Sequence, residues 1–183
     1  MIRKQSNKTA IQSQHMIADA LFSLMNRKPF QKISITEICE EAAIGRKTFY
    51  RNFDTKEDVI HFHLNGLCEQ YEKEIQGLTI RELLYHHFVF LRQHADIFVI
   101  LYRNDLHPMA ARRFAELIPQ TMPQWSEDPV QQEYYSAYLI SGIEAIQRIW
   151  VKRGFQETTD EVVGYVHRMQ SGIQTLGKQA DRT

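Results

Sequence analysis

The stretch 45–53, GRKTFYRNF, contains three basic and three aromatic residues within nine positions. On a helix that begins at the start of this stretch, Phe49 and Phe53 are four residues apart and face the same side, toward a core. The cations Arg46 and Lys47 share the opposite side, where they can meet phosphates or base edges. The pattern therefore predicts a short helix that is anchored by aromatic rings on one side and positively charged on the other.

The residues before this stretch predict a second short helix. The sequence 34–37, SITE, is a capping box, in which Ser34 accepts a backbone N–H bond and Glu37 reaches back to the chain. The helix runs through residues 38–42, and a tight connection at 43–45 leads into the basic helix. Two short helices joined by a tight turn are typical of a helix-turn-helix, whose second helix enters the major groove of DNA.

A solvated basic helix edge is the alternative interpretation of the same nine residues. The capping box and turn before them, and the helix start at residues 54–57 (DTKE) after them, favour DNA binding instead. Tyr50 fits that interpretation, because its hydroxyl can donate to a phosphate while its ring lies against the protein.

The rest of the chain also has helical periodicity. Its 183 residues, 43% of them apolar, can bury a sizeable core, either as one domain or as a small domain followed by a larger one. Outside the two short helices, we expect helices at residues 9–25, 54–75, 79–93, 96–103, 108–118, 130–153 and 158–176. A proline-containing loop is expected at 119–129 and a frayed tail at 177–183. The predicted fold class is all-α, with about nine helices.

Charge and cysteine content narrow the class of protein. The formal net charge is zero, but residues 1–62 hold 10 Lys+Arg and 7 Asp+Glu, whereas residues 63–183 hold the remaining 12 and 15. Cys39 and Cys68 are too few for a disulfide framework, so we expect reduced, buried thiols and a cytoplasmic protein. No apolar run approaches the ~20 residues that cross a bilayer, so no membrane association is expected.

At residues 35–59 the chain resembles the DNA-binding domain of the TetR/AcrR family of transcriptional regulators. Along the chain, the resemblance begins with an apolar residue, two polar residues and Ala42 before the turn. It continues with Thr48, an apolar residue and Tyr50, then Phe53, and ends with the run from Lys56 to Val59. It implies a three-helix helix-turn-helix domain at about residues 8–68 and a larger helical effector and dimerisation domain at 69–183. It also implies a homodimer, expected to be a repressor, that binds a palindromic DNA operator and is released or altered by an unknown effector.

The resemblance assigns roles to individual residues. Four are assigned to the DNA backbone: Thr36, Thr48, Tyr50 and Lys56. Arg46 and Lys47, early in the recognition helix, are the candidates for base edges, since an arginine fork fits guanine O6 and N7. Thr36 lies near a helix N-terminus, which attracts phosphate. Two residues depart from the usual pattern: Ala43 stands where the turn commonly has Gly, and Gly45 stands where a Ser, Thr or Asn cap is common.

Residues 138–155 are similar to a C-terminal subtype of the family that includes the activator of a dihydroxyacetone kinase operon. In that activator the domain recognises a partner protein, so the alternative function is an activator, or a regulator controlled by a protein rather than a small molecule. The last two helices are expected to form the dimer interface as a four-helix bundle. The candidate interface residues are Tyr138, Gly142, Ile146, Ile149 and Trp150. Packing of this stripe within its own chain is the alternative.

Six aromatic residues outside those two helices are candidates for a ligand pocket: Tyr85, Phe88, Phe98, Tyr102, Phe114 and Trp125. Packed cores draw on the same residue types, so the pattern leaves a cavity and a solid core equally open.

Catalysis and metal binding have little support. His61 and His63 are two apart on a helix and face away from each other, and no Cys or carboxylate completes a site, so structural or surface histidines are favoured over a metal centre. The chain has no Gly-rich phosphate loop, nucleophile elbow or paired carboxylates. We therefore expect no cofactor and no enzyme activity, and a helical interaction module is the competing class.

Overall fold

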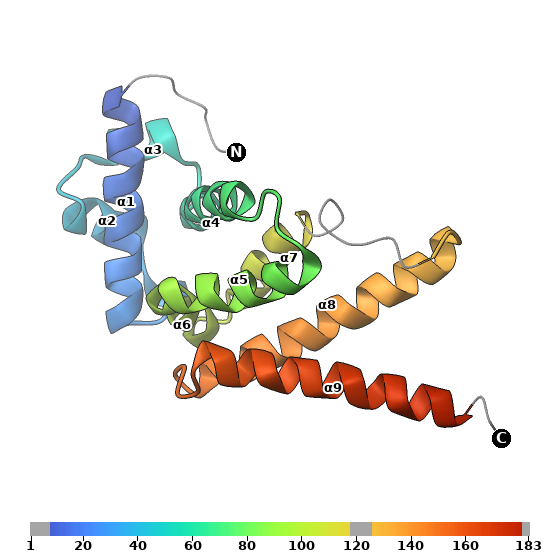
Figure 1. Cartoon of the computed structure of the whole chain (residues 1–183). Helices are drawn as coiled ribbons and strands as arrows, with labels where there is room; N and C mark the ends of the chain where they lie inside the picture. The colour runs from blue at the N-terminus through green and yellow to red at the C-terminus, as the bar shows by residue number, and fades with distance from the viewer. Residues whose placement is uncertain (1–7, 118–125, 181–183) are drawn as a thin grey trace. The chain divides into compact units, whose positions relative to one another are not determined.

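The computed structural model describes residues 8–117 and 126–180 (Figure 1). Over those residues the chain forms nine α-helices and no strand, as predicted, together with one 3-10 turn. It divides into two compact units. The N-terminal unit contains Met1–Glu74 and Ile100–Leu117, and the C-terminal unit contains Ile75–Val99 and Ile118–Thr183. The domain boundary expected near residue 68 stays a prediction.

The helices follow the predicted order closely. The N-terminal unit contains α1 (Lys8–Arg27), η1 (Phe30–Lys32), α2 (Ile35–Glu41), α3 (Arg46–Asn52), α4 (Lys56–Glu74) and α7 (His107–Ala115). The C-terminal unit contains α5 (Ile80–Gln93), α8 (Pro129–Lys152) and α9 (Thr159–Ala180). Helix α6 (Ala95–Arg103) belongs in part to each unit.

Two local predictions differ from the structure. The 3-10 turn η1 was not expected, because Pro29 ends one helical pattern and the next cap follows closely. Helix α9 continues to Ala180, beyond the predicted end at residue 176. The added residues include lysine, glutamine and alanine, which are good helix formers, and one glycine does not end a helix. Residues 118–125 of the expected loop lie outside the described residues.

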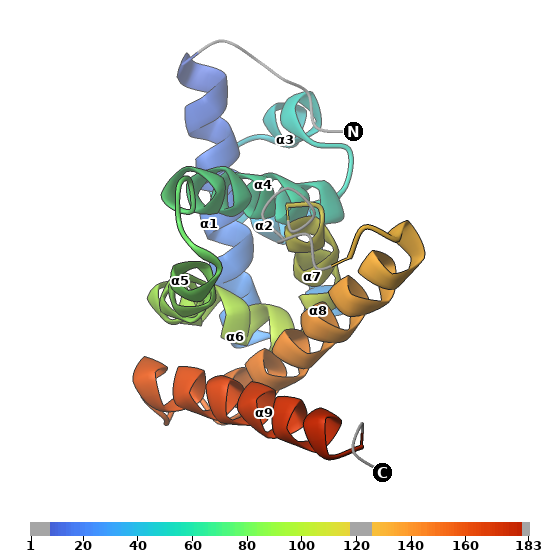
Figure 2. The ribbon, with the colours of Figure 1, turned by 45° about the vertical axis from the view of Figure 1, so that its right-hand side comes forward.

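The core of the N-terminal unit forms where α1 contacts α2, α3 and α4 (Figure 2). Phe49 and Phe53 are almost completely buried, as their four-residue spacing predicts, and their ring centroids lie 6.1 Å apart. Phe53 also meets the ring of Phe62 on α4 at 5.6 Å. These contacts fix which side of α3 faces the core.

The turn between α2 and α3 has an unusual backbone. Ala43 has φ of 51°, in the left-handed region that favours glycine. The N–H of Ile44 donates to the carbonyl of Cys39 at 2.9 Å, which satisfies the end of α2. Gly45 precedes α3 without a side-chain cap. Backbone hydrogen bonds therefore hold the tight connection despite both departures from the family pattern.

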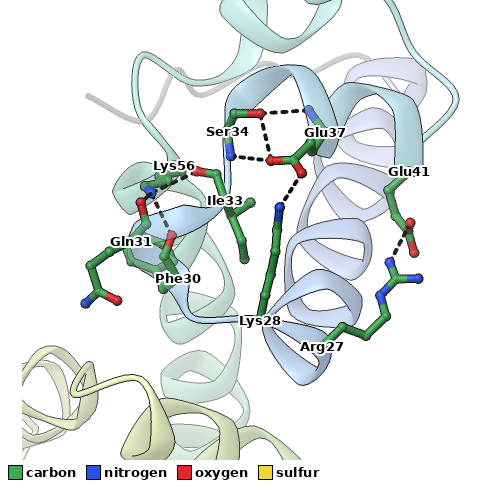
Figure 3. A network of polar contacts seen from close by, with 9 residues as sticks. All are labelled: Arg27, Lys28, Phe30, Gln31, Ile33, Ser34, Glu37, Glu41 and Lys56. Carbon is green, nitrogen blue, oxygen red and sulfur yellow. Dashed lines mark hydrogen bonds and ion pairs between the residues drawn. The ribbon is translucent and has the colours of Figure 1, made fainter.

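Polar contacts join α1 to α2 (Figure 3). The predicted capping box is present: Ser34 Oγ accepts from the N–H of Glu37 at 3.2 Å, and the N–H of Ser34 donates to Glu37 Oε2 at 2.9 Å. The other Glu37 oxygen accepts from Lys28 at the end of α1. Arg27 pairs with Glu41 at 2.6 Å. The start of α2 is thereby fixed on α1.

The core of the C-terminal unit is built around Trp150 of α8. Its ring meets Phe88 of α5 at 5.7 Å and Phe155 at 4.8 Å, and its Nε1–H donates to the carbonyl of Glu157 at 3.0 Å. The Arg92 guanidinium donates to the carbonyls of Phe155 and Glu157. Helices α8 and α9 diverge from this connection (Figure 1).

The Glu37 contacts predict a pH dependence of stability. The hydrogen bond from Lys28, followed by the bonds from Ser34, lowers the pKa of Glu37 from 4.5 to about 2. A carboxyl with a lowered folded pKa stabilises the fold above its unfolded pKa, and that contribution is lost as the pH falls from about 4.5 toward 2. We expect the thermal midpoint to fall less steeply over this range in Glu37→Gln than in wild type.

Circular dichroism melts at stepped pH values measure this difference. Glu72→Gln, at an exposed position of α4, is the matched control and should keep the wild-type slope. Identical slopes for wild type and Glu37→Gln would contradict the assigned role of the carboxylate.

Candidate nucleic-acid interface

Helix α3 exposes the residues that the sequence assigns to DNA. Arg46 and Lys47 are exposed, Tyr50 is 42% exposed, and Thr48 is half-buried. The Arg46 guanidinium carbon lies 5.9 Å from the centroid of the Tyr50 ring. The Tyr50 ring in turn meets buried Phe49 edge-on at 5.6 Å. The cation and the phenol are thus presented together on a helix whose opposite side is held in the core.

A residue that sequence reasoning missed holds the end of this helix. Asn52 is 2% exposed, and its Nδ2 donates to the carbonyl of Thr48 at 2.9 Å. A polar residue four positions after Thr48, between two anchoring aromatics, was the signal that the sequence offered. The bond ties the side chain of the last residue of α3 to a carbonyl one turn earlier, which helps a helix of seven residues to keep its shape.

Thr36 is exposed in the first turn of α2. The prediction used the attraction of a helix N-terminus for phosphate. In the structure the Glu37 side chain already binds the backbone N–H of Ser34 at this end, and Lys28 and Ser34 keep its pKa low. The helix terminus therefore faces an ionised carboxylate of its own chain, and Thr36 has its hydroxyl to offer to a phosphate.

Lys56 has a different environment from the other five predicted residues. Its ammonium contacts the carbonyls of Phe30, Gln31 and Ile33, as Figure 3 shows. The nitrogen also lies 4.4 Å from the centroid of the Phe30 ring. The structure thus places Lys56 on the turn before α2, within the protein's own contacts.

Residues 17–61 match the family model described as bacterial regulatory proteins, tetR family. This segment therefore has the sequence pattern of the TetR family. The matched segment contains all six residues that the sequence assigned to DNA, and the family prediction is confirmed. The matched family is one of regulatory proteins and not of enzymes.

Solved structures share the fold across nearly the whole chain. A TetR transcriptional regulator from Streptococcus agalactiae 2603V is 20% identical, with a TM-score of 0.71 over 88% of this chain and 95% of that one. The fatty acid degradation regulator FadR from Bacillus halodurans is 14% identical, with a TM-score of 0.63 over 91% and 96%. The dihydroxyacetone kinase operon activator DhaS is 18% identical, with a TM-score of 0.57 over 90% and 98%. No curated protein matches the chain.

Five of the six candidate pocket residues lie in the described part of the chain, and they are divided between the two units. Tyr85, Phe88 and Phe98 belong to the C-terminal unit, Tyr102 and Phe114 belong to the N-terminal unit, and Trp125 lies outside the described residues. Phe88 and Phe98 are buried, and Phe88 packs on the core tryptophan. Tyr102 stacks on a histidine and Phe114 meets a tyrosine within their own unit. The ligand pocket expected from these residues stays a prediction.

Tyr85 is the one of those five that lines a groove of about 520 Å³ in the C-terminal unit. The groove lies between α5 and α9. Its other lining residues include Arg81, His86, Val163 and His167. The neighbouring Asp160 carboxylate raises the pKa of the Tyr85 phenol.

One histidine, His87, packs between two helices of the C-terminal unit. Among the described residues, no group of three potential metal ligands is found. The ring of His87 on α5 lies 3.3 Å from Gln147 Oε1 on α8, and burial lowers the pKa of His87 to about 4. His87 is thus a neutral packing residue at physiological pH. In the same described part, no helix is long and apolar enough to cross a membrane.

Arg46 is the sharpest test of the base contacts. We expect Arg46→Ala to relax base preference at one position in each DNA half-site, since removal of a bidentate pair costs ~1–3 kcal/mol of discrimination. Selection of duplexes from a random-sequence pool by wild type and variant measures the preference. Lys73→Ala, an exposed lysine in the last turn of α4, is the control and should reproduce the wild-type profile. An unchanged profile for Arg46→Ala would remove Arg46 from the base contacts.

Proposed function

We propose that this chain is a sequence-specific transcriptional regulator that binds a palindromic operator as a homodimer. The observation that carries the proposal is the orientation of α3, with Phe49 and Phe53 buried and Arg46, Lys47 and Tyr50 exposed, inside a segment that matches the tetR family. Residues 8–68 act as the DNA-binding domain and residues 69–183 as the effector and dimerisation domain. Such a regulator works in the cytoplasm, where the DNA is.

The DNA contacts divide by residue type. Arg46 and Lys47 contact base edges from the first turn of α3, since the first residues of a recognition helix enter the groove. Thr36, Thr48 and Tyr50 contact phosphates through their hydroxyls, which fix the register of the helix on the duplex.

The exposed apolar side chains of α8 and α9 support a homodimer. Tyr138 is 65% exposed and Ile149 is 59% exposed, and Gly142 has no atom within 4 Å of where a Cβ would lie. Tyr134 on α8 and Tyr165 on α9 are exposed as well. Large apolar side chains gathered on two helices mark a protein interface.

Trp150 is not part of the proposed interface, because it is only 2% exposed and lies in the core of its own unit. Ile146 is half-buried and can contribute to both surfaces. The alternative of packing within one chain therefore applies to Trp150, and the stripe from Tyr138 to Ile149 carries the proposed dimer contact.

Repression is the proposed sign of regulation, because a dimer on an operator excludes polymerase by occupancy alone, whereas activation needs a further contact. An effector that alters the spacing of the two recognition helices relieves the repression. Tyr85 and the groove between α5 and α9 are the described candidate for a small-molecule contact. The fold similarity to DhaS supports the alternative of an activator, or of control by a protein partner.

Selection of duplexes from a random-sequence pool tests the proposed function. A dimer of this type enriches two inverted half-sites whose centres lie one helical turn, about 34 Å, apart. Enriched sequences without two-fold symmetry would contradict the palindrome, and no enrichment at all would contradict sequence-specific binding. A pull-down that uses the C-terminal unit as bait distinguishes control by a protein partner from control by a small molecule.

Gly142→Leu tests the dimer interface. A Cβ at residue 142 has no atom of the chain within 4 Å, so we expect the added side chain to disturb a neighbouring subunit. Overpacking costs ~1–3 kcal/mol, so we expect the dimer dissociation constant to rise by at least about tenfold, with a parallel loss of operator affinity.

Sedimentation velocity measures the dissociation constant. Gly66→Leu is the matched control, because Gly66 also lies inside a helix with no atom within 4 Å of where a Cβ would lie, and it should remain a dimer. A dimeric Gly142→Leu protein with wild-type operator affinity would remove this part of α8 from the interface.

A further inference from the structure

We propose that Lys56 serves DNA binding as a positioning residue that clamps the two ends of the helix-turn-helix together, and that it makes no phosphate contact. The inference rests on the proposed DNA-binding function. It departs from the role that the sequence resemblance implied for this lysine, and the contacts of its ammonium group are the reason.

The Lys56 ammonium uses its donors within the protein. Nζ lies 2.7 Å from the carbonyl oxygen of Phe30, 2.9 Å from that of Ile33 and 3.4 Å from that of Gln31 (Figure 3). A lysine ammonium has three N–H donors, so these three carbonyls match its capacity. The side chain also passes over the Phe30 ring, with Nζ 4.4 Å from its centroid, which adds a cation–π attraction.

The carbonyls belong to a helical turn that carries partial negative charge. Phe30 and Gln31 lie in η1, and Ile33 caps its C-terminal end. The Phe30 carbonyl accepts from the N–H of Ile33 at 3.0 Å and has a second lone pair for Lys56, and carbonyls at the end of a helical turn attract cations. To reach a phosphate, the ammonium would leave all three acceptors and the Phe30 ring.

Phe30 is held from a second direction by Asn104. The N–H of Phe30 donates to Asn104 Oδ1 at 2.7 Å, and Asn104 Nδ2 donates to the carbonyl of Ile100 at 2.9 Å. Asn104 is 6% exposed and Phe30 is 3% exposed. Both backbone polar groups of Phe30 are therefore bound by side chains from distant positions of the same unit, which is the mark of a fixed point in the fold.

The location of this fixed point gives it a role in DNA binding. The turn η1 comes directly before α2, and Lys56 is the first residue of α4, directly after α3. The contact between them closes the chain segment that contains both helices of the helix-turn-helix. Without it, α2 and α3 keep their own contacts with α1 but their two ends are no longer tied, and a smaller fraction of molecules has α3 placed for the groove.

Salt dependence separates a clamp from a phosphate contact. Removal of one phosphate contact changes the slope of log affinity against log salt by ~0.9, whereas removal of a positioning residue lowers affinity without changing the slope. The probe is a duplex that wild-type protein enriches from a random-sequence pool, titrated by fluorescence anisotropy at several salt concentrations. The variants are Lys56→Met, which removes the charge and all three donors, and Asn104→Leu, which removes the acceptor for Phe30.

We expect both variants to bind about tenfold more weakly than wild type, a change of ~1.4 kcal/mol, with the wild-type salt slope. Lys47→Met should lower the slope, which confirms that the assay detects the removal of a DNA-binding cation. Lys73→Met, with the same charge change at the far end of α4, should match wild type in both quantities. Lys56→Arg should recover most of the affinity, because a guanidinium can donate to the same carbonyls.

A reduced slope in Lys56→Met would overturn the inference and restore the phosphate contact. Unchanged affinity in Lys56→Met would overturn it as well. If Lys56→Met does not fold, Lys56→Gln gives the same slope test, since it removes the charge but keeps two donors. Hydrogen exchange adds a direct readout: the Phe30 amide should lose protection in Asn104→Leu, and unchanged protection would remove Asn104 from the clamp. If wild type enriches no duplex, the proposed function fails before the variants are compared.

Discussion

The orientation of α3 depends on the burial of Phe49 and Phe53. A helix of seven residues is too short to be stable alone in water, so tertiary contacts decide whether it forms and which side it presents. Each buried phenylalanine contributes ~1.5–3 kcal/mol through the loss of apolar surface from water. Because both rings come from one side of α3, the same burial that stabilises the helix also points Arg46 and Lys47 to solvent.

Local signals in the sequence predicted the parts of the fold that depend on near neighbours. The capping box at Ser34 and Glu37 and the spacing of the two phenylalanines both act within one turn of helix, and the structure has both. The bond from Phe30 to Asn104 joins residues 74 positions apart, and no local pattern announces it. The same holds for Lys56, whose partners are carbonyls and have no side-chain signature.

The C-terminal predictions show the limit of helical periodicity. The pattern on α8 predicted one apolar stripe, yet Trp150 faces its own core while Tyr138 faces solvent. A stripe at helical spacing gives the side of a helix but not the surface that this side meets, and on a long helix the two ends can meet different surfaces. The aromatic candidates for a pocket are divided between the two units for a related reason, because composition carries no information on which unit a residue joins.

The distribution of charge explains how a formally neutral chain can suit DNA. Within the described part of the N-terminal unit, Arg27 and Lys28 pair with Glu41 and Glu37, and Lys56 binds backbone carbonyls. No carboxylate of that part forms an ion pair with Arg46 or Lys47, so both cations of α3 keep their charge for a DNA partner. Non-specific attraction to phosphate increases with the number of free cations. Because Arg27, Lys28 and Lys56 make contacts within the fold, this attraction is limited. Affinity for DNA then depends on a few residues, such as Arg46 and Lys47, whose orientation is fixed by the burial of Phe49 and Phe53. This favours recognition of the base sequence over general attraction to negative charge.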